Sequence, residues 1–154
     1  NIEIDPTLSQ LANGCLNDKK RFGGSINIVV CCDIGVSMVK KINKGDTVNY
    51  GRTFKADKEM KIATVTAGYA DGFSRLLSNQ AEVVIRGTKC PIVGRICMDM
   101  CMIDLTGIDC KEDDTAILFN EDYPVERIAE ACDTIPYEIL TSISQRVKRI
   151  YYQE

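Results

Sequence analysis

The chain has 154 residues, a length that suits one globular domain with room for a hydrophobic core. Its 22 acidic and 19 basic residues give a net charge of −3 without a basic stripe, which excludes nucleic acid as an expected partner. Its apolar runs fall far short of the roughly 20 residues that a membrane-spanning helix needs, and we expect no signal peptide and a cytoplasmic location.

Residues 1–25 predict a helix followed by a connector. Asp5 can cap the helix and Pro6 suits its first position. Apolar residues then recur at helical spacing, at Leu8, Leu11, Ala12 and Cys15. We assign no function to this segment and expect residues 26–154 to form the main domain.

From residue 26 onward the pattern changes to the period of two that is typical of β-strands. The first run places six side chains on one face: Ile28, Val30, Cys32, Ile34, Val36 and Met38. Further strands are expected over residues 61–67, 81–86, 92–104 and 115–119, with residues 87–91 as the turn between the second and third. Short strands separated by turn signals favour a barrel or a sandwich over a parallel sheet.

Two short helices are expected near the carboxyl end, because a proline opens each apolar stripe. Pro124 precedes the first stripe, which holds Val125, Ile128, Ala129 and Cys132. Pro136 precedes the second, which holds Ile139, Leu140 and Ile143. Residues 146–152 then alternate like a final strand. The predicted fold class is mainly β and barrel-like, with a few short helices.

The chain has 8 cysteines but no Cys-x-x-Cys spacing and no histidine. Zinc sites normally combine these residues at recognisable spacings, so we expect no metal site, and a thiol-rich metal binder is the weakest alternative. We interpret the cysteines as small reduced residues of the core. Without histidine, any general base must be a carboxylate, a lysine, a cysteine or a tyrosine.

Two tyrosines lie beside glycines where strands are expected to end. Tyr50 precedes Gly51, so its phenol could be presented at a strand end, although such a tyrosine is more often a packed aromatic. Tyr69 lies in Gly-Tyr-Ala-Asp-Gly, which predicts a tight loop in which Asp71 bonds local amides and Gly72 is left-handed. Loops of this kind also carry binding sites.

Residues 94–102 read Gly-Arg-Ile-Cys-Met-Asp-Met-Cys-Met, an unusual density of sulfur. As a strand, this run would place Arg95, Cys97, Asp99 and Cys101 on one face. The other face would carry Ile96, Met98, Met100 and Met102, with the methionines filling the core. A buried Asp99 would then need partners. Further on, Tyr137 follows the expected helix start, where its hydroxyl could reach an anion such as phosphate.

Four blocks, in order, resemble the C-terminal β-domain of bacterial alanine racemase over about residues 28–154. They are Val48-Asn-Tyr-Gly51, Gly68-Tyr-Ala-Asp-Gly72 with Leu77-Ser-Asn79, Pro91-Ile-Val-Gly-Arg-Ile-Cys-Met-Asp99, and Thr134-Ile-Pro-Tyr-Glu138 with Arg146-Val-Lys-Arg149. Each block alone is weak. Their shared order and spacing make the resemblance specific.

The resemblance implies a pyridoxal 5′-phosphate enzyme that interconverts L- and D-alanine for peptidoglycan. Its N-terminal TIM barrel, which this chain lacks, carries the lysine that binds the cofactor covalently. Head-to-tail homodimers bring the β-domain to the partner's site. The resemblance places the L-face base at Tyr50, and because a free phenol has a pKa of ~10, cations from the barrel would have to lower it. We expect the isolated chain to be inactive.

Other roles are also implied only by the resemblance. The backbone amide of Met98 would contact the substrate carboxylate, Tyr69 would line the access path, Arg95 would lie further out along it, and Asp99 would lie nearby. Tyr137 would bond the cofactor phosphate and crowd the substrate side chain, which favours alanine. Departures from the common pattern stand at Asn49 (often serine), Met100 (often glutamine), Thr66–Ala67 (often Pro-Ile or Pro-Val) and Thr141 (often cysteine).

Two further alternatives stay open. The chain could be the racemase domain of a membrane-anchored serine or alanine racemase of the vancomycin-resistance type, at the cytoplasmic face of a membrane. It could also be a β-domain interaction module that has lost the chemistry, although retention of Tyr50 and of the Arg95–Asp99 run counts against this.

Overall fold

The computed structural model of this chain describes residues 33–120 and 122–148. The helix predicted within residues 1–25, and the strand positions Ile28, Val30 and Cys32, lie outside these residues. The described part contains an antiparallel six-stranded sheet, a two-stranded hairpin and two short helices, which confirms the mainly β prediction. None of these helices in the described part is long and apolar enough to cross a membrane.

The sheet closes on itself into a barrel-like form. Its strands run in the spatial order β6 (Thr88–Pro91), β5 (Glu82–Ile85), β8 (Thr115–Ile117), β1 (Asp33–Ile42), β4 (Met60–Val65) and β7 (Cys101–Asp104). The two outer strands then meet, because Ile92, just after β6, bridges Ile103 of β7. The amide of Val93 also donates to the carbonyl of Met102 at 2.8 Å.

Two apolar clusters hold the domain together. The larger fills the barrel and is built from inward side chains such as Val65, Ile85 and Ile103, each with no exposed surface. The smaller includes Val48 and Val93 and lies beneath the hairpin of β2 (Thr47–Val48) and β3 (Phe54–Lys55). Val48, the last residue of β2, belongs to this cluster and directly precedes the turn at residues 49–53.

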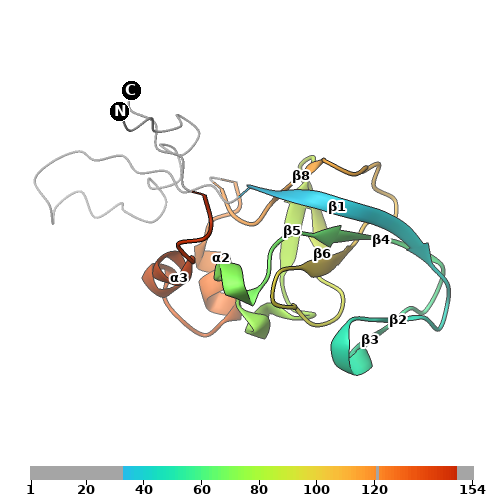
Figure 1. The fold of residues 1–154 in the computed structure, drawn as a ribbon, viewed down its shortest axis with the longest axis horizontal. Helices are drawn as coiled ribbons and strands as arrows, with labels where there is room; N and C mark the ends of the chain where they lie inside the picture. The colour runs from blue at the N-terminus through green and yellow to red at the C-terminus, as the bar shows by residue number, and fades with distance from the viewer. Residues whose placement is uncertain (1–32, 121, 149–154) are drawn as a thin grey trace, which may run out of the picture.

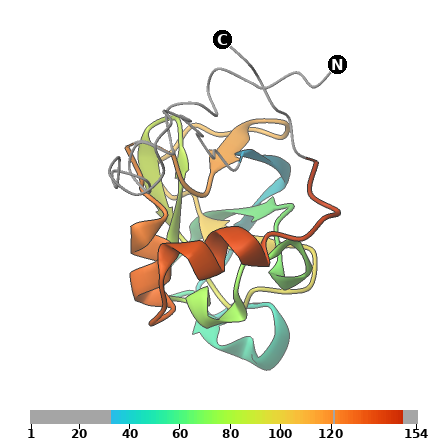
Figure 2. The ribbon, with the colours of Figure 1, turned by 90° about the vertical axis from the view of Figure 1, so that its left-hand side faces the viewer.

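Two helices cover one end of the molecule. They are α2 (Glu126–Ala131), which begins shortly after Pro124, and α3 (Pro136–Ser142), which Pro136 opens as predicted. The two helices bury Ile128, Ala129 and Ile139. The β2–β3 hairpin lies at the opposite end of the long axis (Figure 1). Figure 2 looks at the helical end and shows α3 lying across it.

The prediction for the face of β1 is wrong at Met38, which is exposed, whereas Val39 packs against the core. The cause is a β-bulge: Val36 pairs with Val65, but Met38 pairs with Thr64, so β1 contains one extra residue. An extra residue inverts the face of every side chain that follows it.

Residues 87–91 were predicted to form a turn, which is also wrong. The turn consists of Arg86 and Gly87, both with positive φ, at 49° and 74°. A two-residue turn with this geometry matches the twist of a hairpin, so pairing resumes at once, with Ile85 opposite Thr88. At the other end of the chain, residues 146–148 are not strand, and 149–152 lie outside the described residues.

The buried thiols of Cys90 and Cys101 predict a loss of stability at alkaline pH. Burial raises the pKa of Cys90 to about 11 and that of Cys101 to about 12. In the unfolded chain thiols ionise near ~8.5, so their contribution is complete below that pH and is lost as the pH rises through 11–12. The urea midpoint should therefore fall between pH 8 and pH 10.

Lysines and tyrosines also titrate in this range, so the control is a Cys101→Ala variant. Its urea midpoint should fall less steeply with pH than that of the parent chain. Equal slopes would contradict the assignment to this thiol.

Candidate functional site

The run 92–104 was predicted to be a strand, but only its end, β7, is one, and residues 94–100 form a loop. The loop begins at Gly94, whose φ is +83°, and turns where the amide of Cys97 donates to the carbonyl of Met100 at 2.9 Å. The predicted faces are therefore wrong. Arg95 and Asp99 are exposed and Cys101 is buried, whereas Ile96 is buried and Met98 and Met100 are exposed rather than filling the core.

A second loop, residues 68–72, is pressed against the 94–100 loop. The amide of Tyr69 donates to the carbonyl of Cys97 and that of Ala70 to the carbonyl of Met98, both at 3.0 Å. A Cβ atom added to Gly68 would approach the Met98 carbonyl oxygen to less than 3.0 Å, so only glycine fits there. The two loops thereby bring Tyr69 and Met98 together.

Within the 68–72 loop the predicted turn chemistry is confirmed. The carboxylate of Asp71 accepts a hydrogen bond from the amide of Gly68 at 2.9 Å, and Gly72 is left-handed, with a φ of +102°. The loop also supports α3, because a Cβ atom on Gly72 would come closer than 3.0 Å to the carbonyl oxygen of Ser142.

Tyr50 stands on the turn that follows β2, and its side chain is turned outward. The residue is 78% exposed, so the prediction that its phenol is presented at a strand end is confirmed. Positive φ angles at Asn49, Gly51 and Arg52 bend the chain sharply around it. The guanidinium of Arg95 lies over this turn. If Gly51 carried a Cβ atom, that atom would lie 3.5 Å from Arg95 Nε.

One arginine, Arg146, ties the two loops together from a distant part of the chain. Its Nε atom donates to Asp71 Oδ1 at 2.8 Å, and its Nη2 atom pairs with Asp99 Oδ1. These side-chain hydrogen bonds raise the pKa of Arg146. Asp99 is exposed rather than buried, and Arg146 is nevertheless its ion-pair partner.

Tyr137, the second residue of α3, is half exposed and lies apart from the other candidates. Among residues 33–120 and 122–148, no hydrogen bond or ion pair joins its side chain to Tyr50, Tyr69 or Met98. The helix that carries it lies at the far end of the long axis from the β2–β3 hairpin (Figure 1).

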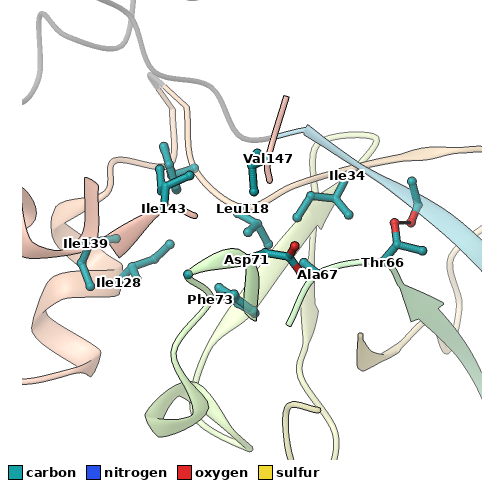
Figure 3. Close-up of a pocket in the computed structure, with 13 residues that line it drawn as sticks. Ile34, Thr66, Ala67, Asp71, Phe73, Leu118, Ile128, Ile139, Ile143 and Val147 are labelled. Atoms are coloured by element: carbon teal, nitrogen blue, oxygen red, sulfur yellow. Dashed lines mark hydrogen bonds between the residues drawn. The ribbon is translucent and has the colours of Figure 1, made fainter. Parts of the chain in front are cut away.

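Two hollows lined by described residues do not gather the six candidate residues in one place. An apolar cavity of about 240 Å³ lies between β1 and the two helices, and none of the six candidates lines it; Ile34, Ala67, Phe73, Leu118, Ile139 and Val147 are among the residues that do (Figure 3). A more open groove of about 520 Å³ is lined by Tyr69 together with Arg75, Leu76 and Glu138. Of the six candidates, Tyr69 alone lines either of these two hollows.

Several large apolar side chains of the described residues are exposed. Besides Tyr50 and Tyr69, the set includes Leu76, Met98, Met100, Ile135 and Tyr137. Most of them stand on the turn and loops described above and on α3. Within the described ranges, no group of three or more cysteine, aspartate or glutamate side chains is placed to hold a metal ion.

Sequence reasoning from the residues alone missed three structural members of this site: Asp71 as an ion-pair partner, Asn79 and Arg146. Asn79 accepts from the amide of Gly94 at 2.6 Å and donates to Thr53 at 3.3 Å. The only signal for Asn79 and Arg146 was their place in the blocks that carry the resemblance. Their contacts span 15 to 75 residues of sequence, which no local pattern reveals.

Comparisons with known proteins give one consistent result. Residues 29–151 match the family model described as alanine racemase, C-terminal domain. The chain is 50% identical over 121 residues to the alanine racemase of Clostridium perfringens, covering 75% of this chain and 31% of that protein. It is 41% identical over 138 residues to that of Thermodesulfovibrio yellowstonii, covering 85% and 38%.

Solved structures agree. The alanine racemase of Bartonella henselae, with covalently bound pyridoxal phosphate, superposes with a TM-score of 0.78 at 39% identity, over 81% of this chain and 35% of that one. The alanine racemase of Clostridium difficile 630 in complex with cycloserine gives a TM-score of 0.74 at 40% identity, over 77% and 32%. The chain thus spans about a third of the length of the relatives it matches.

Proposed function

Because the chain belongs to the alanine racemase C-terminal domain family, we propose that it completes the active site of an enzyme that interconverts L- and D-alanine. The D-alanine formed would serve peptidoglycan synthesis. The observation that carries the proposal is the outward presentation of Tyr50 on a bent turn above a buried cluster. A phenol in that position can act only on a molecule that arrives from outside this domain.

In the proposed reaction, the deprotonated Oη atom of Tyr50 takes the α-proton from L-alanine, and a base of the barrel on the opposite face supplies the proton that completes D-alanine. In the reverse direction Tyr50 returns a proton to its own face. Pyridoxal phosphate, when bound, withdraws electrons from the α-carbon and so makes its proton acidic. The residues present suit contacts to such a complex but not its anchoring. Within the described ranges, no lysine takes part in the contacts among the turn and the two loops.

Met98 suits the contact with the substrate carboxylate. Its carbonyl is fixed by the amide of Ala70, whereas its own N–H donates to no group among residues 33–120 and 122–148. An amide that is held in place and unpaired can bind a carboxylate oxygen without first breaking another hydrogen bond. We assign Tyr69 to the access path and Arg95 and Asp99 to its outer part.

Tyr137 is assigned to the phosphate of the cofactor and to the side-chain end of the substrate. Its half-exposed ring, at the start of α3, can meet a group held by another domain. A bulky ring next to the substrate side chain leaves room for a methyl group and disfavours larger ones. We therefore propose alanine, rather than serine, as the preferred substrate.

The exposed apolar residues support a proposal for the partners of this domain. We propose that an N-terminal TIM barrel carries the lysine that holds the cofactor and that two complete subunits associate head to tail. In this arrangement Tyr50, Tyr69 and Met98 would face the partner subunit's barrel. Covering them would account for a set of large apolar side chains that the isolated domain leaves in water.

The proposal predicts that the isolated chain is inactive and that the complete enzyme, meaning this chain joined to the proposed N-terminal barrel, is active. Purified chain should show no exchange of the α-proton of alanine in deuterated water with added pyridoxal phosphate, followed by proton NMR. The complete enzyme should exchange the proton and form the other enantiomer, faster with alanine than with serine.

Two results would contradict this. Exchange catalysed by the isolated chain would refute its dependence on a barrel. A complete enzyme that is folded and loaded with cofactor, yet racemises neither amino acid, would refute the proposed function itself.

A further inference from the structure

The residue before Tyr50 has a backbone conformation that asparagine rarely adopts. Asn49 has φ +60° and ψ −174°, a combination found almost only in glycine. Such a conformation persists only where surrounding contacts impose it, and it often marks a functional site. In this structure Asn49 is held by contacts with the 94–100 loop.

The side chain of Asn49 is bonded to the 94–100 loop. Its Nδ2 atom donates to the carbonyl oxygen of Arg95 at 2.8 Å, across 46 residues of sequence. The two backbones touch here, because a Cβ atom on Gly94 would lie only 3.0 Å from the carbonyl oxygen of Val48. The start of the turn is thus fixed to Gly94 and Arg95.

The other end of the turn, at Thr53, is held to Gly94 of the same loop by a second asparagine, Asn79. Asn79 donates from Nδ2 to the hydroxyl of Thr53 at 3.3 Å, while its Oδ1 accepts from the amide of Gly94 at 2.6 Å. Residues 49–53 are therefore held at both ends against the 94–100 loop.

The side chain of Tyr50 contributes nothing to this arrangement. Among residues 33–120 and 122–148 its hydroxyl makes no hydrogen bond, and the ring is mostly exposed. The location of the phenol is consequently set by the turn on which it stands. The loop that holds the turn is the one that also presents the amide of Met98.

We propose that Asn49 is a positioning residue that fixes the Tyr50 hydroxyl relative to the Met98 amide. Its bond to Arg95 connects the group that moves the proton to the loop that binds the carboxylate, so that both meet one substrate in a fixed geometry. The proposal rests on the function assigned to Tyr50 above. An error of about 1 Å in such a geometry can cost about 100-fold in rate.

Two variants of the complete enzyme separate the hydrogen bond from the backbone conformation. Asn49→Gly relieves the unfavourable φ but removes the bond, and Asn49→Asp keeps the shape but turns an acceptor toward the Arg95 carbonyl. Both should lower kcat for L-alanine by roughly 10- to 100-fold with little change in KM. Asp113→Gly is the matched control, because Asp113 is exposed with φ +69° and lies outside these loops, and its rate should be unchanged.

Combining Asn49→Gly with Tyr50→Phe tests whether the residue acts through the phenol. If it does, Asn49→Gly should change the residual rate of the Tyr50→Phe enzyme by less than about twofold, because coupled residues are not additive. A wild-type kcat in Asn49→Gly, or a full further loss in the double variant, would overturn the positioning role. A Tyr50→Phe enzyme at full rate would instead refute the base role assigned to Tyr50, and the positioning role with it, while leaving the racemase function itself in place.

A measurement on the chain itself requires neither cofactor nor turnover. Amide hydrogen exchange should be faster in Asn49→Gly at both residues 49–53 and residues 94–97, because the bond joins the two segments. In Asp113→Gly both segments should exchange as in the parent chain. Unchanged exchange at residues 94–97 in Asn49→Gly would overturn the connection even if the activity had fallen.

Discussion

Replacing Tyr50 with phenylalanine in the complete enzyme should lower kcat for racemisation by about 10²- to 10⁴-fold, the usual contribution of a general base. The loss in kcat/KM should be equal for L- and D-alanine, because the two enantiomers have equal energy and the ratio of the two kcat/KM values is therefore fixed. Stability should not change, since the hydroxyl makes no hydrogen bond among residues 33–120 and 122–148 and the side chain is exposed.

Proton exchange in deuterated water tests on which face of the α-carbon Tyr50 acts. Exchange of the α-proton of L-alanine should fall with racemisation, because Tyr50 is proposed to act on that face. D-alanine should still exchange its α-proton without inversion, because the base on the opposite face is proposed to belong to the barrel. Equal loss of exchange for both enantiomers would show that the substitution damages the site as a whole.

The matched control is Tyr123→Phe. Tyr123 is another tyrosine of this domain, and its hydroxyl donates to the carbonyl of Gly87 at 3.3 Å, outside the turn and loops of the site. Its loss should cost about 1 kcal/mol of stability and leave racemisation unchanged. A Tyr50→Phe enzyme as fast as this control would contradict the proposed base.

The elements that the sequence predicted well are those with local causes. Pro124 lies just before α2 and Pro136 opens α3, because proline suits the start of a helix. Gly72 takes the left-handed conformation at the end of a tight loop. The extra residue that exposes Met38 has no such signal, because a bulge depends on the pairing partner.

The loop 94–100 shows why a hydrophobic pattern can mislead at a site. Alternation of apolar residues predicts that one face is buried, but it does not say by what. Met98 and Met100 are exposed in this domain, and their apolar character is explained if a different surface covers them. Read as core residues of a strand, they led to a wrong secondary structure, although the role given to the Met98 amide stays a prediction.

The long-range hydrogen bonds and ion pairs of the site could not be predicted from local sequence. Arg146 reaches Asp71 across 75 residues and Asp99 across 47, and Asn49 reaches Arg95 across 46. Each of these polar residues also suits an ordinary surface position. Only the folded barrel brings them together.

Replacing Gly68 with alanine should destabilise the site more than a glycine-to-alanine substitution at any other described glycine. The added Cβ atom would lie less than 3.0 Å from the carbonyl oxygens of both Cys97 and Met98. These oxygens accept the amides of Tyr69 and Ala70, so neither loop can retreat without breaking a hydrogen bond. Overpacking costs about 1–3 kcal/mol and each lost bond about 0.5–1.5 kcal/mol, which gives roughly 3 kcal/mol in all.

Urea unfolding of the purified chain measures this loss, and Gly35→Ala provides the control. A Cβ atom on Gly35 would meet only the Thr66 hydroxyl, at 3.8 Å, so its free energy of unfolding should change by less than about 1 kcal/mol. In the complete enzyme, Gly68→Ala should also raise KM, because separating the loops moves the Met98 amide away from the substrate carboxylate. If Gly68→Ala were as stable as Gly35→Ala, the two loops would not be in backbone contact, and the fixed position assigned to the Met98 amide would be wrong.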